Sequence, residues 1–214
     1  MRRAGGVKAR WSGGTAALSA VLLCGPAAGE ERRWAVMGSV SRWVNADLLE
    51  IPERTATGRL RFEDSNFAGA ALTRTIVPSF AIPLPGTGFA FRGNRIELEG
   101  QVVRHFGEQH HWEGTLALMF RTGDIPLFGG LSVNLGFAEG FSYAGERPEL
   151  EGSLRVRPRH FLNYLAVEAE FKHASLPGVA VVPRIHHRSG VFGLIAPKTS
   201  GSNFIGVGVR VDLN

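Results

Sequence analysis

Apolar and polar residues alternate with a period of two through most of the chain after residue 30, and little helical periodicity is present. Eight segments show this alternation. They cover residues 35–44, 66–77, 92–106, 110–122, 131–143, 161–173, 179–189 and 202–213. Each has about ten residues or slightly more, which is the length that crosses a bilayer as a tilted strand. An even number of such strands predicts an all-β fold, an eight-stranded antiparallel up-and-down transmembrane barrel.

The alternation separates an aliphatic face from a charged face. In the segment 161–173, one face carries Leu165, Val167, Ala169 and Phe171, and the other carries Tyr164, Glu168, Glu170 and Lys172. A membrane barrel with an apolar exterior and a soluble lipocalin-like barrel with an apolar interior both satisfy this pattern. We favour the membrane barrel, because inward charges on neighbouring strands could pair there, such as Glu168 and Glu170 with Arg184 and Arg188.

The first 29 residues have the pattern of a secretory signal. A basic start is followed by the apolar run Gly14–Leu23 and by the small residues Ala27, Ala28 and Gly29 before Glu30. The alternative is a short core helix. We therefore expect a signal peptide at 1–29, a barrel at 30–214 and export to the bacterial outer membrane.

Composition excludes several classes of protein. The net charge of +5 depends on the leader, because four of the 24 Lys and Arg residues lie there and the remaining 20 face 19 Asp and Glu residues. The basic balance therefore does not indicate a nucleic-acid partner. The single cysteine, Cys24, excludes an internal disulfide and a cysteine zinc site. The pattern does not define an oligomeric state.

The strand order predicts which connections share one end of the barrel. With both termini periplasmic, the external connections are 45–65, 107–109, 144–160 and 190–201. The turn at 78–91 is long for a periplasmic turn. Glu139 interrupts the apolar face of its strand, which predicts a bulge or the membrane rim.

Three polar residues share the apolar face near the external end of the last two strands. His187 and Ser189 are two positions apart, and Asn203 has the parity of Ile205 and Val207. Polar groups aimed at lipid are costly, so their presence indicates a function. The three could form a serine nucleophile, a histidine base and an amide that orients the imidazole. Backbone N–H groups near Gly190 could stabilise the oxyanion.

The stretch from Arg184 to Leu213 resembles the C-terminal hairpin of the lipid A 3-O-deacylase family, which comprises eight-stranded outer-membrane esterases. The motif of that family is His-x-Ser, then a loop with Pro and Gly, then an acidic or amide residue; it is matched here by His187, Ser189, Pro197, Gly201 and Asn203. The family usually has Asn directly after the serine, where this chain has Gly190. The resemblance implies hydrolysis of an ester-linked 3-hydroxyacyl chain of lipid A, with lipopolysaccharide as partner and no cofactor.

Other interpretations remain open. A non-catalytic barrel with a structural or surface-binding role and a soluble periplasmic lipid carrier both fit the pattern. His105, His110 and His111 are expected to form a solvated rim without a metal, and His186 is expected to pair with Glu168 or Glu170. The Arg-rich loop from Arg147 to Arg159 could bind lipopolysaccharide phosphates.

Overall fold

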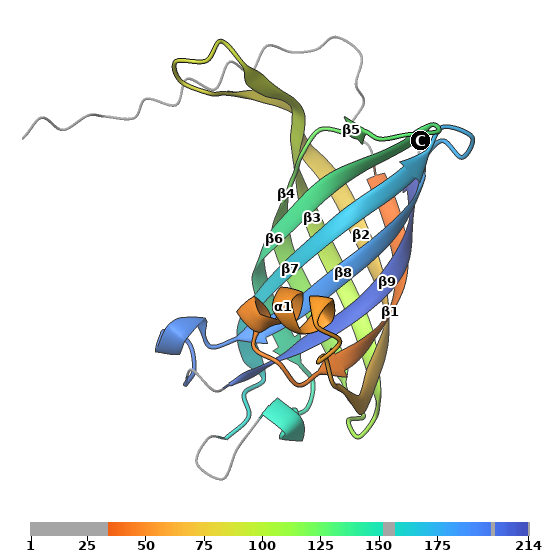
Figure 1. The fold of residues 1–214 in the computed structure, drawn as a ribbon. Helices are drawn as coiled ribbons and strands as arrows, with labels where there is room; N and C mark the ends of the chain where they lie inside the picture. Colours follow the sequence, from red (N-terminus) through yellow and green to blue (C-terminus); the bar gives the residue numbers. More distant parts are fainter. Residues whose placement is uncertain (1–33, 152–156, 198–199, 214) are drawn as a thin grey trace, which may run out of the picture.

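A closed antiparallel barrel forms the body of the protein (Figure 1). The computed structural model describes residues 34–151, 157–197 and 200–213, so the signal peptide expected at 1–29 lies outside the described residues. No helix in these ranges is long and apolar enough to cross a membrane. The described chain begins with β1 and finishes with β9 at the same end of the barrel. We call this end the proximal end and the opposite end the distal end.

Eight strands form the ring, as predicted. They are β1 (Trp34–Val44), β2 (Phe62–Pro83), β3 (Ala90–Gly107), β4 (Trp112–Arg121), β6 (Leu131–Ala144), β7 (Phe161–His173), β8 (Val179–Ser189) and β9 (Gly201–Leu213). Each pairs antiparallel with the next, and β9 closes the ring on β1. A two-residue strand, β5 (Ile125–Pro126), pairs with the start of β6 at the proximal end.

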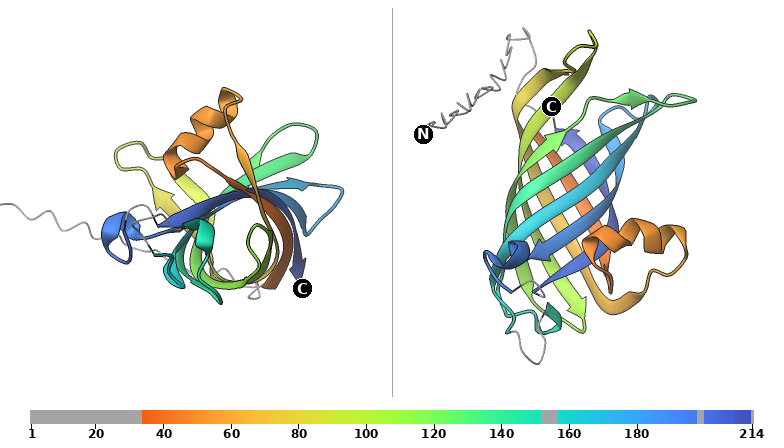
Figure 2. Two further views of the ribbon diagram at one scale, coloured as in Figure 1. Left: turned by 90° about the horizontal axis from the view of Figure 1, so that it is seen from below. Right: turned by 60° about the vertical axis from the view of Figure 1, so that its left-hand side comes forward.

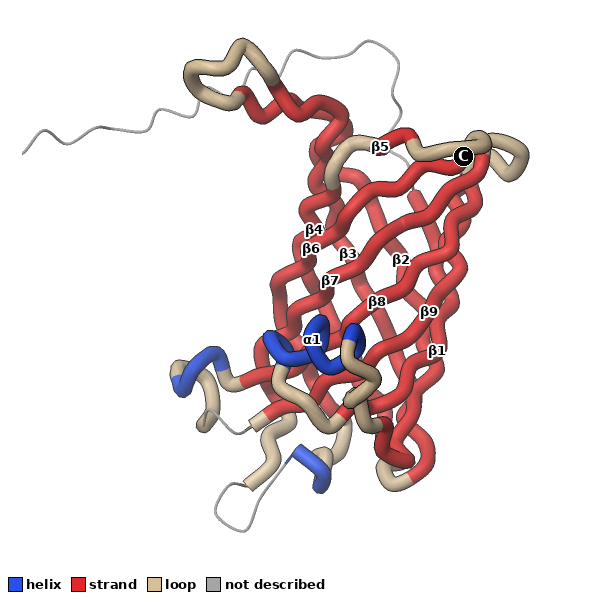
Figure 3. Tube along the Cα trace, in the orientation of Figure 1, coloured by secondary structure: helices blue, strands red, loops and turns tan. Residues whose placement is uncertain are grey.

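The helical segments lie at the distal end with the loops (Figure 3). The loop between β1 and β2 contains a 3₁₀ turn (Leu48–Glu50) and the helix α1 (Ile51–Ala56). Two further 3₁₀ turns lie at Glu149–Glu151 and Val191–Gly193. Figure 2 shows α1 outside the ring of strands, beside the wall.

The outer wall is apolar, as a lipid-facing wall requires. Val207 and Val209 point outward with exposed fractions of 46% and 51%, whereas Arg210 between Val209 and Val211 is buried in the lumen. Aromatic residues mark both ends of the apolar band: the ring of Trp34 packs on Arg74 at the proximal end, and that of Trp112 packs on Arg104 at the distal end. An exterior of this kind excludes the soluble lipocalin-like arrangement.

Ion pairs fill the proximal half of the lumen. This proximal ion cluster contains four glutamates and four arginines: Glu97, Glu99, Glu168, Glu170, Arg95, Arg121, Arg184 and Arg210. Arg121 contacts three of the carboxylates, including Glu168 at 2.5 Å and Glu97 at 3.1 Å. The charges balance, so they can remain ionised without solvent. The predicted pairing of Glu168 with Arg184 is confirmed at 3.0 Å.

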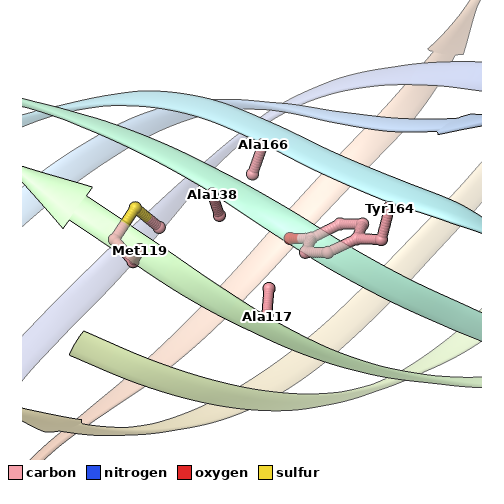
Figure 4. Close-up of a cluster of buried hydrophobic side chains, with 5 residues drawn as sticks. All are labelled: Ala117, Met119, Ala138, Tyr164 and Ala166. Carbon is pink, nitrogen blue, oxygen red and sulfur yellow. The ribbon is translucent and has the colours of Figure 1, made fainter. Parts of the chain in front are cut away.

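Small side chains separate this cluster from the distal half of the lumen. Ala117, Ala138 and Ala166 surround Met119 and Tyr164, all of them buried (Figure 4). Their small size leaves room for the tyrosine ring inside a narrow barrel.

A histidine-rich group occupies the distal half. Glu113 accepts hydrogen bonds from Ser142 and from the rings of His105 and His186, at 2.6, 2.9 and 3.0 Å. The expected pairing of His186 with Glu168 or Glu170 is therefore wrong, because Glu113 lies nearer on the far wall. The expectation of a solvated rim is also wrong for His105 and His111, which are buried, and it holds only for the exposed His110.

Two irregular features differ from a simple barrel. Around the connection predicted as a long turn at 78–91, β2 and β3 continue past the wall as a two-stranded hairpin with several register shifts (Figure 1). Of the two alternatives predicted at Glu139, a bulge or the membrane rim, the bulge is absent, since β6 pairs in continuous register with β4 and β7 there. Glu139 instead lies exposed on the outer wall.

Candidate active site on the outer wall

His187 and Asn203 lie directly opposite each other on β8 and β9. The imidazole Nδ1 and the amide Oδ1 of this pair are 2.7 Å apart. Asn203 Nδ2 donates to the carbonyl of Ala46 at 2.8 Å, which fixes the amide with its oxygen toward the ring. Nδ1 must therefore carry the proton, and Nε2 keeps its lone pair. This is the tautomer that a general base requires.

Ser189 lies at the end of β8 on the same outward face as His187, as predicted. It pairs with Asn163 on β7 and with Gly201 on β9. No hydrogen bond joins the Ser189 hydroxyl to the His187 ring, although the two residues are two positions apart on one strand. A catalytic role would require the hydroxyl and the imidazole Nε2 to come within hydrogen-bond distance.

The turn after Ser189 is tight. A Cβ on Gly190 would lie 2.1 Å from the carbonyl oxygen of Ala196, so only glycine fits there. Val191 has a φ of 49°, which is a strained conformation for a β-branched residue. The N–H groups of Gly190 and Val191 donate to no described residue. These two groups could therefore serve as oxyanion donors next to the hydroxyl.

A polar pocket of about 500 Å³ adjoins Asn203. It lies between the start of β9 and the loop that carries α1, and its charged lining residues are Asp47, Glu50, Arg54 and Arg61. Arg54 is paired with Glu50 at 2.8 Å. The lining therefore carries two acidic and two basic side chains, which makes the pocket polar without a net charge.

Two further outward residues belong to this region: Asn163, which the sequence analysis missed, and Glu139, which it noted without placing it near Ser189. Asn163 Nδ2 donates to Glu139 at 2.5 Å and to the carbonyl of Gly140 at 3.0 Å, so both side chains lie on the outer wall, with Asn163 directly beside Ser189. Parity alone placed both on the apolar face and could have marked them. Their position next to Ser189 required the register between β6, β7 and β8, which parity does not give.

A metal ion could be held within the described residues by His105, His111 and Glu113, which offer ligand atoms within 4.8 Å of one another. The rings of the two histidines are stacked at 4.1 Å and nearly parallel, so their lone pairs do not converge. Both oxygens of Glu113 already accept hydrogen bonds. The pKa of His111 is lowered to about 4, because burial and the neighbouring His105 disfavour the imidazolium. We therefore describe this group as a buried cluster in which His105 is hydrogen-bonded to Glu113 and stacked on His111, whose Nε2 has no hydrogen-bond partner among the described residues.

No protein-family model and no curated protein matches the chain. Among solved structures, the outer membrane enzyme PagL superimposes with a TM-score of 0.52 and 13% identity, over 83% of this chain and 98% of that one. Neisserial surface protein A (NspA) gives a TM-score of 0.46 and 11% identity, over 85% and 99%. The N-terminal β-barrel domain of Pseudomonas aeruginosa OprF gives 0.45 and 9%, over 86% and 100%.

At these identities the similarity concerns the fold. It agrees with the closed ring of eight strands. The chain is an eight-stranded β-barrel of the bacterial outer membrane, as the strand pattern predicted.

Proposed function

We propose that the protein is an outer-membrane esterase that removes an ester-linked acyl chain from lipid A. The observation that supports this most is the His187–Asn203 pair, held in the tautomer of a general base beside Ser189 on the wall that faces lipid. A soluble substrate would not require these groups on the lipid side. The resemblance of Arg184–Leu213 to lipid A 3-O-deacylases supports the same substrate.

The reaction needs only groups of this chain. His187 Nε2 removes the proton of Ser189 as Oγ attacks the ester carbonyl, and N–H groups of Gly190 and Val191 stabilise the negative oxygen. The imidazolium then gives its proton to the departing sugar oxygen, which leaves an acyl-serine. Water, deprotonated by His187, hydrolyses this intermediate and releases the fatty acid. Asn203 stabilises the imidazolium less than a carboxylate would, so we expect a modest rate.

The headgroup would lie at the distal end, which we take as extracellular. The pocket beside Asn203 contains Arg54 and Arg61, and the basic residues Arg147, Arg157 and Arg159 line a second cavity of about 280 Å³. Guanidinium groups bind phosphate in two-point contacts, which would orient a phosphorylated sugar over the site.

A non-catalytic barrel is the second candidate. The observation that favours it is the missing hydrogen bond between Ser189 and His187 in the described structure. Such a protein would keep the barrel and its surface pockets but would leave lipid A unchanged.

Mass spectrometry of lipid A separates the two. We expect cells that produce the protein to contain lipid A lacking one acyl chain, and Ser189→Ala and His187→Ala to reduce this product by about 10³-fold or more. His173 and Ser175 form a matched control, because they are an exposed histidine–serine pair bonded at 2.7 Å at the proximal end. Their alanine variants should behave as wild type. Identical lipid A with the wild-type protein and with both site variants would refute the esterase.

A further inference from the structure

The outward polar residues of the wall formed by β6 to β9 are concentrated in one patch. Apart from Tyr143 and His173 at strand ends, the polar side chains on this face are Glu139, Asn163, His187, Ser189 and Asn203. His187, Ser189 and Asn203 belong to the proposed catalytic group. Glu139 and Asn163 have no part in that mechanism, yet a carboxylate facing lipid is costly without a function.

Asn163 is the nearest of these residues to Ser189 across the sheet. The two are directly paired between β7 and β8, so their Cβ atoms lie about 5 Å apart. Asn163 is only 8% exposed although it points outward, and the stacked rings of Phe141 and Phe161 lie beside it. A substrate carbonyl placed at Ser189 would therefore lie next to this amide.

The amide has a defined orientation. Both hydrogens of Nδ2 are used, by Glu139 and by the carbonyl of Gly140. Oδ1 accepts no hydrogen bond from the described residues. Asn163 thus presents an acceptor to the bound acyl group. An acceptor cannot stabilise an oxyanion, but it can bind a hydroxyl or N–H donor of the substrate.

We propose that Asn163 selects acyl chains with a hydroxyl group close to the ester carbonyl, and that Glu139 positions the Asn163 amide for this purpose. The inference rests on the proposed esterase function and deepens it. A plain acyl chain, as in a phospholipid, would leave Oδ1 unpaired in an apolar setting. Sites that hydrogen-bond a substrate hydroxyl discriminate strongly against analogues without it.

The test compares two esters of a glucosamine phosphate, one carrying 3-hydroxytetradecanoate and the other tetradecanoate. For the folded wild-type protein in detergent, we expect kcat/KM to be at least about tenfold higher for the hydroxylated ester. Asn163→Leu should reduce this ratio to about one. Glu139→Leu should do the same by releasing the amide, and Glu139→Gln should restore the preference, because it still accepts from Nδ2. Val167→Leu, on the same face of β7, should retain the wild-type ratio.

A binding measurement on the Ser189→Ala protein separates selection from catalysis. Native mass spectrometry should show more bound hydroxylated ester than plain ester, and Asn163→Leu should abolish the difference. If wild type hydrolyses both esters equally, the selection is refuted while the esterase stands. If wild type hydrolyses neither ester, the esterase is refuted. The acceptor role of Asn163 then stands only if the hydroxylated ester binds better than the plain one. Equal binding of both esters refutes the acceptor role.

Discussion

At the residue scale, the candidate site depends on how two asparagine side chains are held. Asn203 donates to the Ala46 carbonyl and Asn163 donates to Glu139 and the Gly140 carbonyl. In each case the bond made by Nδ2 determines where Oδ1 points. Asn203 therefore positions the imidazole, and its effect on the rate should be separable from an effect on lipid binding.

Asn203→Leu tests this positioning. We expect kcat for the hydroxylated ester to fall roughly 10²-fold with little change in KM, because His187 loses the partner that selects its tautomer while the wall remains apolar. Steady-state hydrolysis in detergent measures both constants. Ile205→Leu, the next outward residue of β9, is the control and should change neither. A change in KM alone would contradict the positioning role.

Arg121 is the residue on which the lumen depends most. Its guanidinium is fully buried and contacts the carboxylates of Glu97, Glu168 and Glu170. Arg121→Met would remove one counter-charge from each of these three buried carboxylates and leave the cluster with a net negative charge. We expect the free energy of unfolding to fall by about 3–5 kcal/mol, measured by urea titration in lipid vesicles. Arg59→Met, in an exposed loop, should change it by no more than about 0.5 kcal/mol.

At the element scale, the hairpin of β3 and β4 carries the distal histidines into the lumen. His105 and His111 are joined by a backbone hydrogen bond at 2.9 Å, and their rings stack. His111 precedes β4 and is buried in its neutral form, with its pKa lowered to about 4 from 6.5. Between these values the unfolded chain binds more protons than the folded one, so stability must decrease as the pH falls.

Unfolding in urea between about pH 4 and 7 tests the hairpin. We expect His111→Phe to remove part of the acid sensitivity, up to about 1.4 kcal/mol per pH unit within that window. Phenylalanine preserves the stacking without a proton to bind. The exposed neighbour His110 supplies the control, since His110→Phe should leave the dependence on pH as in wild type. If the free energy of unfolding depends on pH equally in wild type and in His111→Phe, folding does not lower the pKa of His111.

At the scale of the whole molecule, the barrel has polar side chains inside and apolar side chains outside, which is the reverse of a soluble protein. Its lumen contains ion pairs and histidines, and its exterior contains aliphatic and aromatic side chains. Burial in lipid therefore replaces burial in a hydrophobic core for about half of the strand residues. The site follows from this arrangement, because polar groups on the exterior face the lipid itself.

Val209→Arg tests the lipid-facing assignment. We expect a loss of roughly 2–4 kcal/mol in the free energy of folding into vesicles, because a charge enters the apolar band. Leu194→Arg is the control, because Leu194 is highly exposed in the distal loop rather than on the wall, and it should have little effect. Equal effects of the two substitutions would argue against a bilayer around β9.

Much of this architecture could be predicted from the sequence. Parity placed Val207 outward and Arg210 inward, and the strand ends were close to those observed except around the β2–β3 hairpin, whose extension past the wall has no signature in a two-residue period. His187, Ser189 and Asn203 were also placed on one face. Their catalytic role stays a prediction. Glu139 was interpreted as a bulge or the membrane rim, because one strand alone does not reveal the neighbour that holds it.

The sequence by itself determined the number of strands, the two faces and the shared face of the candidate residues, because a strand alternates its side chains whatever surrounds it. The structure showed that this face points outward. Apart from the Glu168–Arg184 pair, the contacts inside the lumen and around the site were decided by the tertiary structure. Closure of the ring brought Glu113 to His186, the register of β7 against β8 brought Asn163 to Ser189, and the loop of Ala46 fixed the Asn203 amide. These contacts depend on the register between strands and on loop paths, which arise from packing of the whole barrel rather than from any local pattern.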